Sequence, residues 1–157
     1  MKLVIQRVLK AKVTSDGVVT GEIEKGLMVL CGVIEGDTAE DMQWLADKTA
    51  KLRIFEDEEG KMNLSVQDIG GSVLVVSNFT LGGDCRKGNR PSFIRAAKEP
   101  LSVDLYEGYL NALREKGLPV EAGVFGAYME IEMTAWGPVT ILMDSDDRAR
   151  PRHGNGG

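Results

Sequence analysis

The feature that most limits the fold is an unbroken apolar run, Leu27 to Ile34. A strand with one solvated face alternates apolar and polar residues, so a run without polar side chains indicates a strand that is buried on both faces. A second run of the same kind extends from Ser72 to Ser77. The sequence therefore predicts two buried strands.

Shorter strands are expected before the first run. Leu3 to Val8 is rich in β-forming residues, Ala11 to Thr14 alternates, and Val18 to Ile23 follows the pair Asp16-Gly17. Asp-Gly between two such segments is a strong signal for a two-residue hairpin turn. We therefore expect antiparallel pairing at the start of the chain.

Two helices are predicted. Asp37 or Thr38 can cap the first, in which apolar residues recur at helical spacing as far as Leu52. The second runs from Leu101 to Lys116, where Gly117 is suited to end it and the proline two residues later stops it.

Two further strands, Tyr128 to Thr134 and Val139 to Met143, are expected near the end, joined by a turn at Gly137-Pro138. With 157 residues and no repeat or linker, the chain has the size of one compact domain. We predict a single α+β domain over residues 1–144. The Gly/Arg-rich residues 145–157 are predicted to form a disordered tail.

The chain has one histidine, His153, which lies in that terminal stretch. Such a segment is a poor place for a preorganised site, so Ser-His-Asp and Cys-His triads and His-rich zinc sites are excluded. The acidic residues of segment 56–60 are expected to form a solvated turn, and neither a metal nor a cofactor is expected. Chemistry must come from other side chains, from the backbone or from the substrate.

Cysteine content and hydropathy indicate the compartment. Cys31 and Cys85 are isolated, which favours reduced thiols in a cytosolic protein, with a disulfide or a reactive Cys85 as the alternative. No segment approaches the ~20 apolar residues of a membrane span, and the N-terminus lacks the apolar region of a signal peptide. We expect a soluble, cytoplasmic protein that does not bind membranes.

Three segments are candidates for chemistry. Ser77-Asn78-Phe79-Thr80 follows a buried strand, where backbone N–H groups and hydroxyls can point into a cleft, although a polar strand end would have the same pattern. Trp136-Gly137-Pro138 can contain a cis peptide, although most X-Pro bonds are trans.

The third segment, 86–98, carries five basic residues in a chain whose net charge is −5. Contact with phosphate explains this patch, and so do solvated surface charges. The negative total argues against broad, nonspecific binding of nucleic acid.

These segments coincide with the motifs of a known family. The sequence resembles the D-aminoacyl-tRNA deacylases, also described as D-tyrosyl-tRNA deacylases, over residues 1 to about 143. The matching motifs are Ile5-Gln6-Arg7-Val8, Gly21-Glu22-Ile23, Arg53-Ile54-Phe55, Gly60-Lys61-Met62-Asn63-Leu64-Ser65, Ser77-Asn78-Phe79-Thr80-Leu81, Lys87-Gly88-Asn89-Arg90-Pro91-Ser92-Phe93 and Gly137-Pro138-Val139-Thr140. Their order and spacing make the match specific.

The resemblance implies an α+β fold with a largely antiparallel, barrel-like sheet and two main helices. It also implies a cytoplasmic homodimer, with active sites at the interface, that hydrolyses the ester of a D-amino acid or glycine with tRNA. The partner is aminoacyl-tRNA, with no cofactor and no metal. The family is thought to use the 2′-OH of the terminal adenosine as a participating group.

The resemblance assigns residue roles. The segment Ser77, Asn78, Phe79 and Thr80 would line the active site, where its amides stabilise the oxyanion. Gly137 and Pro138 would form a cis pair that enters the partner's site, binds the substrate amino group and excludes L side chains. Arg7 would brace that pair, and Phe125 and Met129 would lie near the pocket. Arg86, Lys87 and Arg90 are candidates for tRNA binding.

Two positions depart from the family pattern: Asn78 replaces the usual Gln, and Ala135 replaces the Asn of an Asn-x-Gly-Pro motif. The shorter Asn78 keeps the amide, and Ala135 can make no side-chain hydrogen bond, so packing by Trp136 would have to compensate.

Two other hypotheses remain: Thr80 is a covalent nucleophile, or the protein binds tRNA through residues 86–98 without chemistry.

Overall fold

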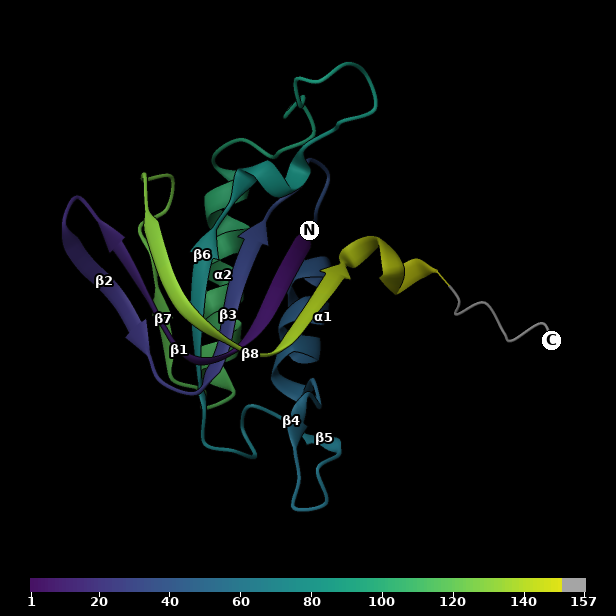
Figure 1. Cartoon of the computed structure of the whole chain (residues 1–157). Coiled ribbons are helices and arrows are strands. Elements are labelled where there is room, and N and C mark those ends of the chain that lie inside the picture. The colour runs from purple at the N-terminus through teal and green to yellow at the C-terminus, as the bar shows by residue number, and fades with distance from the viewer. Residues whose placement is uncertain (151–157) are drawn as a thin grey trace.

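The sheet is organised around one long strand, β1 (Lys2–Ser15), as the computed structural model of residues 1–150 shows (Figure 1). The first half of β1 lies between β3 (Gly26–Gly32) and β8 (Glu130–Asp144), and the second half lies between β2 (Val18–Ile23) and β8. All three pairings are antiparallel. The predicted hairpin joins β1 to β2, with positive φ at both Asp16 and Gly17, as a type I′ turn requires.

A second group of pairings is parallel. The strand β6 (Ser72–Ser77) pairs in parallel with β3 on one side and with β7 (Val120–Ala122) on the other. The sheet is therefore mixed, with the order β2-β1-β3-β6-β7 and with β8 on β1. The sheet curls toward a barrel, so that its end strands β2 and β7 come close together. A Cβ added to Gly21 of β2 would lie only 2.9 Å from the Ala122 carbonyl oxygen of β7.

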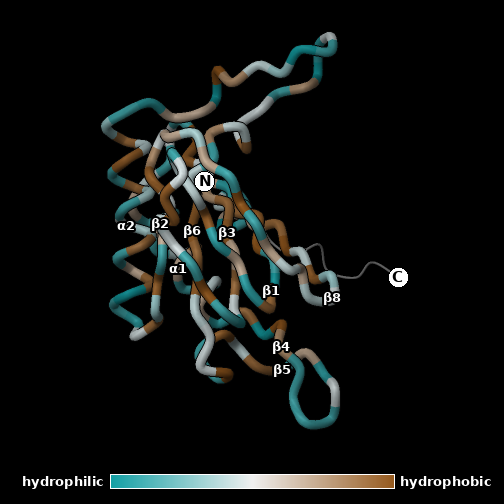
Figure 2. Tube along the Cα trace, turned by 60° about the vertical axis from the view of Figure 1, so that its left-hand side comes forward, coloured by the Kyte–Doolittle hydropathy of each residue, from teal (hydrophilic) through white to brown (hydrophobic). Residues whose placement is uncertain are grey.

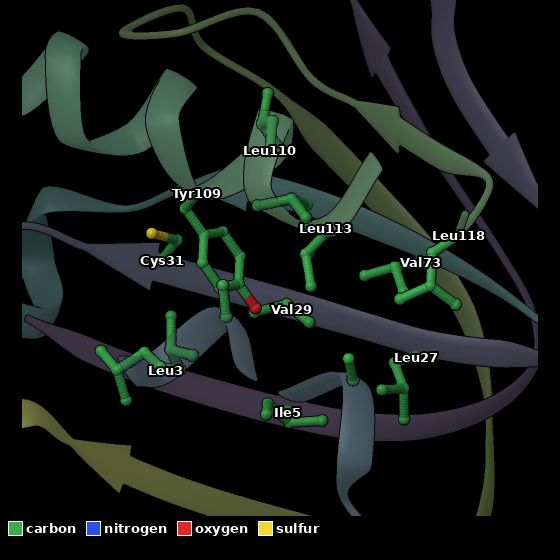
Figure 3. Packing of buried hydrophobic residues seen from close by; sticks show 14 of the residues in the cluster. Leu3, Ile5, Leu27, Val29, Cys31, Val73, Tyr109, Leu110, Leu113 and Leu118 are labelled. Carbon is green, nitrogen blue, oxygen red and sulfur yellow. The ribbon is translucent and has the colours of Figure 1, made fainter. Parts of the chain in front are cut away.

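The curled sheet buries side chains on both faces. One face packs on α1 (Ala39–Lys51) and α2 (Leu101–Glu115), where Leu27 and Val29 of β3 meet Tyr109 and other helix residues (Figure 3). The opposite face encloses a smaller cluster that includes Met28 of the same strand. Both apolar runs are thus buried strands, as predicted from the sequence.

The ends of both helices follow from local chemistry. Thr38 caps α1 in a capping box: its hydroxyl accepts from the Asp41 amide at 3.2 Å, and the Asp41 carboxylate accepts from the Thr38 amide at 2.9 Å. The helix α2 begins at Leu101 and ends before Gly117, whose φ of +86° suits a residue without a side chain. The two predicted helices are confirmed.

Three sequence expectations were wrong in detail. Each of β1 and β8 is a single continuous strand and not a pair of strands, because the two run alongside each other over their whole length. Gly137-Pro138 therefore lies in a bulge of β8, not in a turn between two strands. Residues 145–149, expected in a disordered tail, form a 3-10 helix, η2 (Ser145–Ala149), in which Arg148 pairs with Glu40 and Asp41 of α1. His153 and the rest of segment 151–157 lie outside the described residues.

Exposed polar segments project from both ends of this core. The short strands β4 (Phe55–Glu56) and β5 (Met62–Leu64) flank the acidic turn, which is exposed as predicted. Figure 2 shows this hairpin and the long loop before α2 as largely hydrophilic.

No helix among residues 1–150 is long and apolar enough to cross a membrane.

Candidate active site

A cavity of about 610 Å³ opens where β6 ends. The segment that follows β6 and the segment that precedes β8 meet there, although they are far apart in the sequence. Six of the predicted site residues line the cavity: Ser77, Asn78, Phe79, Thr80, Phe125 and Met129.

The segment after β6 turns immediately into a 3-10 helix, η1 (Phe79–Gly82). Asn78 caps this turn, because its side-chain oxygen accepts from both the Thr80 amide, at 3.1 Å, and the Thr80 hydroxyl. Asn is a favoured cap residue, and the shorter side chain at this position is thus used within the turn. Gly32 allows the close approach to β3, since a Cβ there would lie 2.8 Å from the Asn78 carbonyl oxygen.

The cap leaves one amide of the turn without a partner. The first N–H groups of a helix have no acceptor within the helix, and here Asn78 satisfies the N–H of Thr80. The Phe79 N–H has no hydrogen-bond acceptor within residues 1–150. A residue that lines the cavity therefore has a free backbone donor, and such a donor can bind an oxygen that carries developing negative charge.

The buried thiol and phenol of the cavity wall are not available as general bases. Burial raises the pKa of the Cys31 thiol to about 12, so this wall residue stays protonated at neutral pH. Burial also raises the pKa of the Tyr106 hydroxyl, which donates to the Val75 carbonyl at 3.3 Å. The Thr80 hydroxyl donates to an amide oxygen, which does not activate it as a nucleophile.

The Gly137-Pro138 bulge does not line this cavity. Both residues are exposed on β8, and the peptide bond between them is cis. Arg7, almost fully buried, donates from Nε to the Trp136 carbonyl and from Nη1 to the Ile54 carbonyl, each at 2.9 Å. Arg7 therefore fastens the bulge to the body of the protein.

The three candidates for tRNA binding lie on the exposed loop before α2, also outside the cavity lining (Figure 1). Arg86 is held by Asp84, with 2.8 Å between Nη2 and Oδ2, and this contact lowers the pKa of the Asp84 carboxyl to about 2. In the described part of the chain, Lys87 and Arg90 form no ion pair. Two of the three cations are thus free to meet a phosphate.

Sequence reasoning missed several cavity residues. Ser102 and Tyr106 come from the first turns of α2, where their spacing fits a buried helix face, and Tyr128 lines the cavity with 92% of its surface exposed. Lys98 was considered only as part of the basic stretch, yet it lines the cavity.

Among residues 1–150, no group of His, Cys, Asp and Glu side chains is arranged to hold a metal ion.

Comparison with known proteins agrees with these features. The sequence model of the family described as D-Tyr-tRNA(Tyr) deacylase matches residues 4–144. A protein named D-aminoacyl-tRNA deacylase from Geobacillus sp. (strain WCH70) is 55% identical over 149 residues, which are 95% of this chain and 98% of that protein. A relative of the same name from Anaeromyxobacter dehalogenans (strain 2CP-C) is 58% identical, covering 92% of this chain and 97% of its own.

Two solved structures share the fold. One, named c-Myc DNA Unwinding Element Binding Protein, has a TM-score of 0.86 and 38% identity over 92% of this chain and 98% of its own. The other, described as a probable eukaryotic D-amino acid tRNA deacylase, has a TM-score of 0.75 and 17% identity over 90% of this chain and 97% of its own. With a family match over nearly its whole described length and relatives more than half identical, this chain belongs to the D-Tyr-tRNA(Tyr) deacylase family.

Proposed function

We propose that this protein hydrolyses the ester that joins a D-amino acid to the terminal ribose of tRNA. The observation that carries the proposal is the unpaired Phe79 amide beside a cavity whose lining includes the residues of the Ser77 to Thr80 motif. Relatives that are 55% and 58% identical are named for this activity.

Hydrolysis here depends on positioning and on oxyanion stabilisation. Water adds to the ester carbonyl carbon, and the carbonyl oxygen, now negative, accepts a hydrogen bond from the Phe79 N–H. The C–O bond to the ribose then breaks as the carbonyl re-forms, and the proton lost by the attacking water passes to the ribose oxygen while the adjacent 2′-OH of the terminal adenosine assists. One such backbone donor is worth about 3 kcal/mol in the barrier. An ester is activated enough for this to suffice without a histidine.

We propose that the Gly137-Pro138 pair supplies chiral selection from a second copy of the chain. In its own subunit the pair is exposed and does not line the cavity. In a homodimer it would enter the other subunit's cavity, where its carbonyl oxygens accept from the substrate amino group and its bulk excludes L side chains. Selection by main-chain atoms tests the α-carbon and tolerates many D side chains.

The exposed surface of β8 supports the proposed dimer. Within residues 1–150 this strand pairs only with β1, and it presents Leu142, with 75% of its surface exposed, and Met133 to solvent. Apolar side chains on an unpaired edge strand are a common site of association between chains. We further propose that glycyl-tRNA is a second substrate, that Lys87 and Arg90 contact tRNA phosphates, and that the enzyme works in the cytoplasm.

The test compares D-tyrosyl-tRNA with L-tyrosyl-tRNA as substrates of the purified dimer. The proposal expects turnover of the D ester and at least a hundredfold slower turnover of the L ester, a difference of about 2.7 kcal/mol. If correctly folded dimer gives no D-specific turnover, the proposal fails.

A covalent mechanism through Thr80 makes a different prediction. The Thr80 hydroxyl has no base beside it in the described residues, so we expect Thr80→Ala to retain D-ester turnover within about threefold. Trapping of an acyl-enzyme, or loss of all turnover in a folded Thr80→Ala variant, would instead support the nucleophile.

A second candidate function is nucleic-acid binding without catalysis. It is favoured by the structural relative that is 38% identical and named a DNA unwinding element binding protein, and by the basic loop. The net charge of −5 argues against it. Binding of uncharged tRNA or duplex DNA, combined with no turnover of any aminoacyl ester, would support this function over hydrolysis.

A further inference from the structure

Trp136 begins the bulge that β8 makes opposite Arg7. Four residues of β8, from Trp136 to Val139, face this single residue of β1, because Gln6 pairs with Thr140 and Val8 pairs with Ala135. Gly137 and Pro138 are exposed, whereas the residues at the two ends of the bulge are half-buried and pack against the core on the helix side. Side chains at the ends of the bulge therefore hold its exposed centre.

At the first end of the bulge, the ring of Trp136 is held by three neighbouring side chains. The Arg7 Cζ lies 4.5 Å from the ring centroid, and the Lys25 Nζ lies 5.5 Å from it. The Phe55 ring packs at 6.2 Å between centroids, tilted by 55°. Cations within about 6 Å of an aromatic face are attracted by its quadrupole, so these contacts fix both the position and the orientation of the indole.

The backbone of the same residue is held as well. Arg7 uses its Nε–H to bind the Trp136 carbonyl while its guanidinium carbon lies near the indole ring. The preceding residue adds no side-chain hydrogen bond, because it is Ala135. Gly137 is closely fitted, since a Cβ there would lie 2.9 Å from the Val139 amide nitrogen and 3.0 Å from Arg7 Nη2.

We infer that Trp136 is a positioning residue for Gly137-Pro138, and that its ring, held by Arg7 and Lys25, sets how strictly the pair rejects L-aminoacyl esters. The inference rests on the proposed function and deepens it. Rejection by steric clash requires a wall that does not yield, and a bulge that shifts by a fraction of an ångström lets the wrong stereoisomer enter. Trp136 does not line the cavity of its own subunit, so its loss should affect selection more than hydrolysis.

The decisive variant is Trp136→Leu, which keeps a smaller apolar side chain and removes the aromatic face. We expect kcat/KM for L-tyrosyl-tRNA to rise about tenfold while kcat for D-tyrosyl-tRNA stays within about twofold. Trp136→Phe, which restores an aromatic face, should recover most of the D-to-L ratio.

Trp44→Leu is the matched control. Trp44 lies on α1, and the Lys48 Nζ lies 5.7 Å from its ring centroid, so it shares the cation–aromatic arrangement at a different site. This control should leave the D-to-L ratio unchanged. An unchanged ratio in folded Trp136→Leu protein, or a parallel loss of turnover on both esters, would overturn the inference.

Lys25→Met keeps the test valid if the Leu variant fails to fold. Lys25 is exposed, so its replacement removes one cation from the ring at little risk to the fold, and we expect the D-to-L ratio to fall about threefold. An unchanged ratio would contradict the inference. Absence of D-ester turnover in the unmodified protein, by contrast, would refute the proposed function.

The anchoring itself can be measured without substrate. The chain has two tryptophans, so Trp44→Phe protein reports Trp136 fluorescence alone. Two nearby cations should make the ratio of iodide to caesium quenching larger than for a free tryptophan derivative, and Lys25→Met should lower that ratio. A ratio equal to that of the free derivative in both proteins would show that the cations do not hold the ring.

Discussion

The cavity and the β8 bulge, the two halves of the proposed site, are built in opposite ways. The cavity is concave, lined by the protein's own side chains, and carries an unpaired backbone donor at Phe79. The bulge is exposed, yet it is fastened to the core by Arg7 and by the ring of Trp136. A segment so firmly held and so exposed is suited to act on another molecule.

This difference separates two tasks. Changes in the cavity should lower the rate of hydrolysis of any ester, whereas changes in the bulge should alter the choice between D and L esters. Variants that affect only one of these measurements test that separation directly.

The largest effect is expected from Phe79→Pro, which removes the Phe79 N–H. Proline is tolerated at the first position of a helical turn, and Asn78 before it has extended backbone angles, φ −147° and ψ 96°. We expect kcat for D-tyrosyl-tRNA to fall by about 10² to 10³, as for loss of one oxyanion donor.

Phe79→Ala is the matched control, because it also removes the exposed ring but keeps the N–H. Both variants lose the edge-to-face contact with Phe93, at 5.2 Å between ring centroids. If steady-state assays find the two variants equally impaired, the amide is not the donor.

Gly137→Ala should have the next largest effect, and on selectivity. Gly137 has φ +127°, a conformation that L residues rarely adopt, and the added Cβ would meet Val139 and Arg7. The bulge must shift, so we expect the ratio of D to L turnover to fall at least tenfold.

Gly60→Ala provides the control for backbone strain. Gly60 also has positive φ, but nothing lies within 4 Å of the added Cβ. It should lower the thermal unfolding temperature by a few degrees, as a loss of about 1 kcal/mol does, and leave the D-to-L ratio intact. Equal D-to-L ratios in Gly137→Ala and Gly60→Ala would show that the bulge does not determine selection.

Much of the fold could be predicted because local signals agreed with one another. The Asp16-Gly17 turn, the Thr38 cap and the apolar runs each act over a few residues, and the structure confirms all of them. The continuity of β8 could not be predicted. It depends on β1, more than a hundred residues earlier, which offers one long edge on which both halves of β8 pair.

The site was predictable in part for the same reason. The segment Ser77 to Thr80 is contiguous, and the resemblance brought it together with Phe125 and Met129, which the structure gathers in one cavity. Lys98, Ser102 and Tyr106 were missed, because they approach through the packing of α2 and carry no local motif. The cation contacts of Trp136 were missed as well, since they join β1, the residue before β3, and β8.

A smaller effect is expected from the basic loop, which lies outside both halves. The double replacement Lys87→Gln and Arg90→Gln should raise KM for aminoacyl-tRNA about tenfold, leave kcat unchanged and reduce the salt dependence of KM. Arg86→Gln should have less effect, because Asp84 already holds that guanidinium.

Lys48→Gln with Lys51→Gln on α1 is the matched control for net charge. It removes two positive charges from a different surface, so KM should not change. Measurement of KM over a range of salt concentrations distinguishes contact by the loop from an effect of total charge. An equal rise in KM in the two double variants would mean that only the total charge of the protein matters.

The smallest effect on activity is expected from modification of the exposed thiol. Cys85 is exposed, whereas Cys31 is buried in the cavity wall with a pKa of about 12. Iodoacetamide at pH 8 should therefore label one thiol per chain, and deacylation should be unchanged. At pH 10, iodoacetamide should still not alkylate Cys31, since the thiol remains protonated until the pH approaches its raised pKa.

Cys85→Ser should abolish labelling of the native protein, and denaturant should then make Cys31 reactive. Mass spectrometry of labelled peptides distinguishes the two sites. Rapid labelling of Cys31 in the native state, with loss of deacylation, would mean that a thiolate is available at the cavity. The separation of tasks would then need revision, because the cavity would hold a nucleophile in addition to the backbone donor at Phe79.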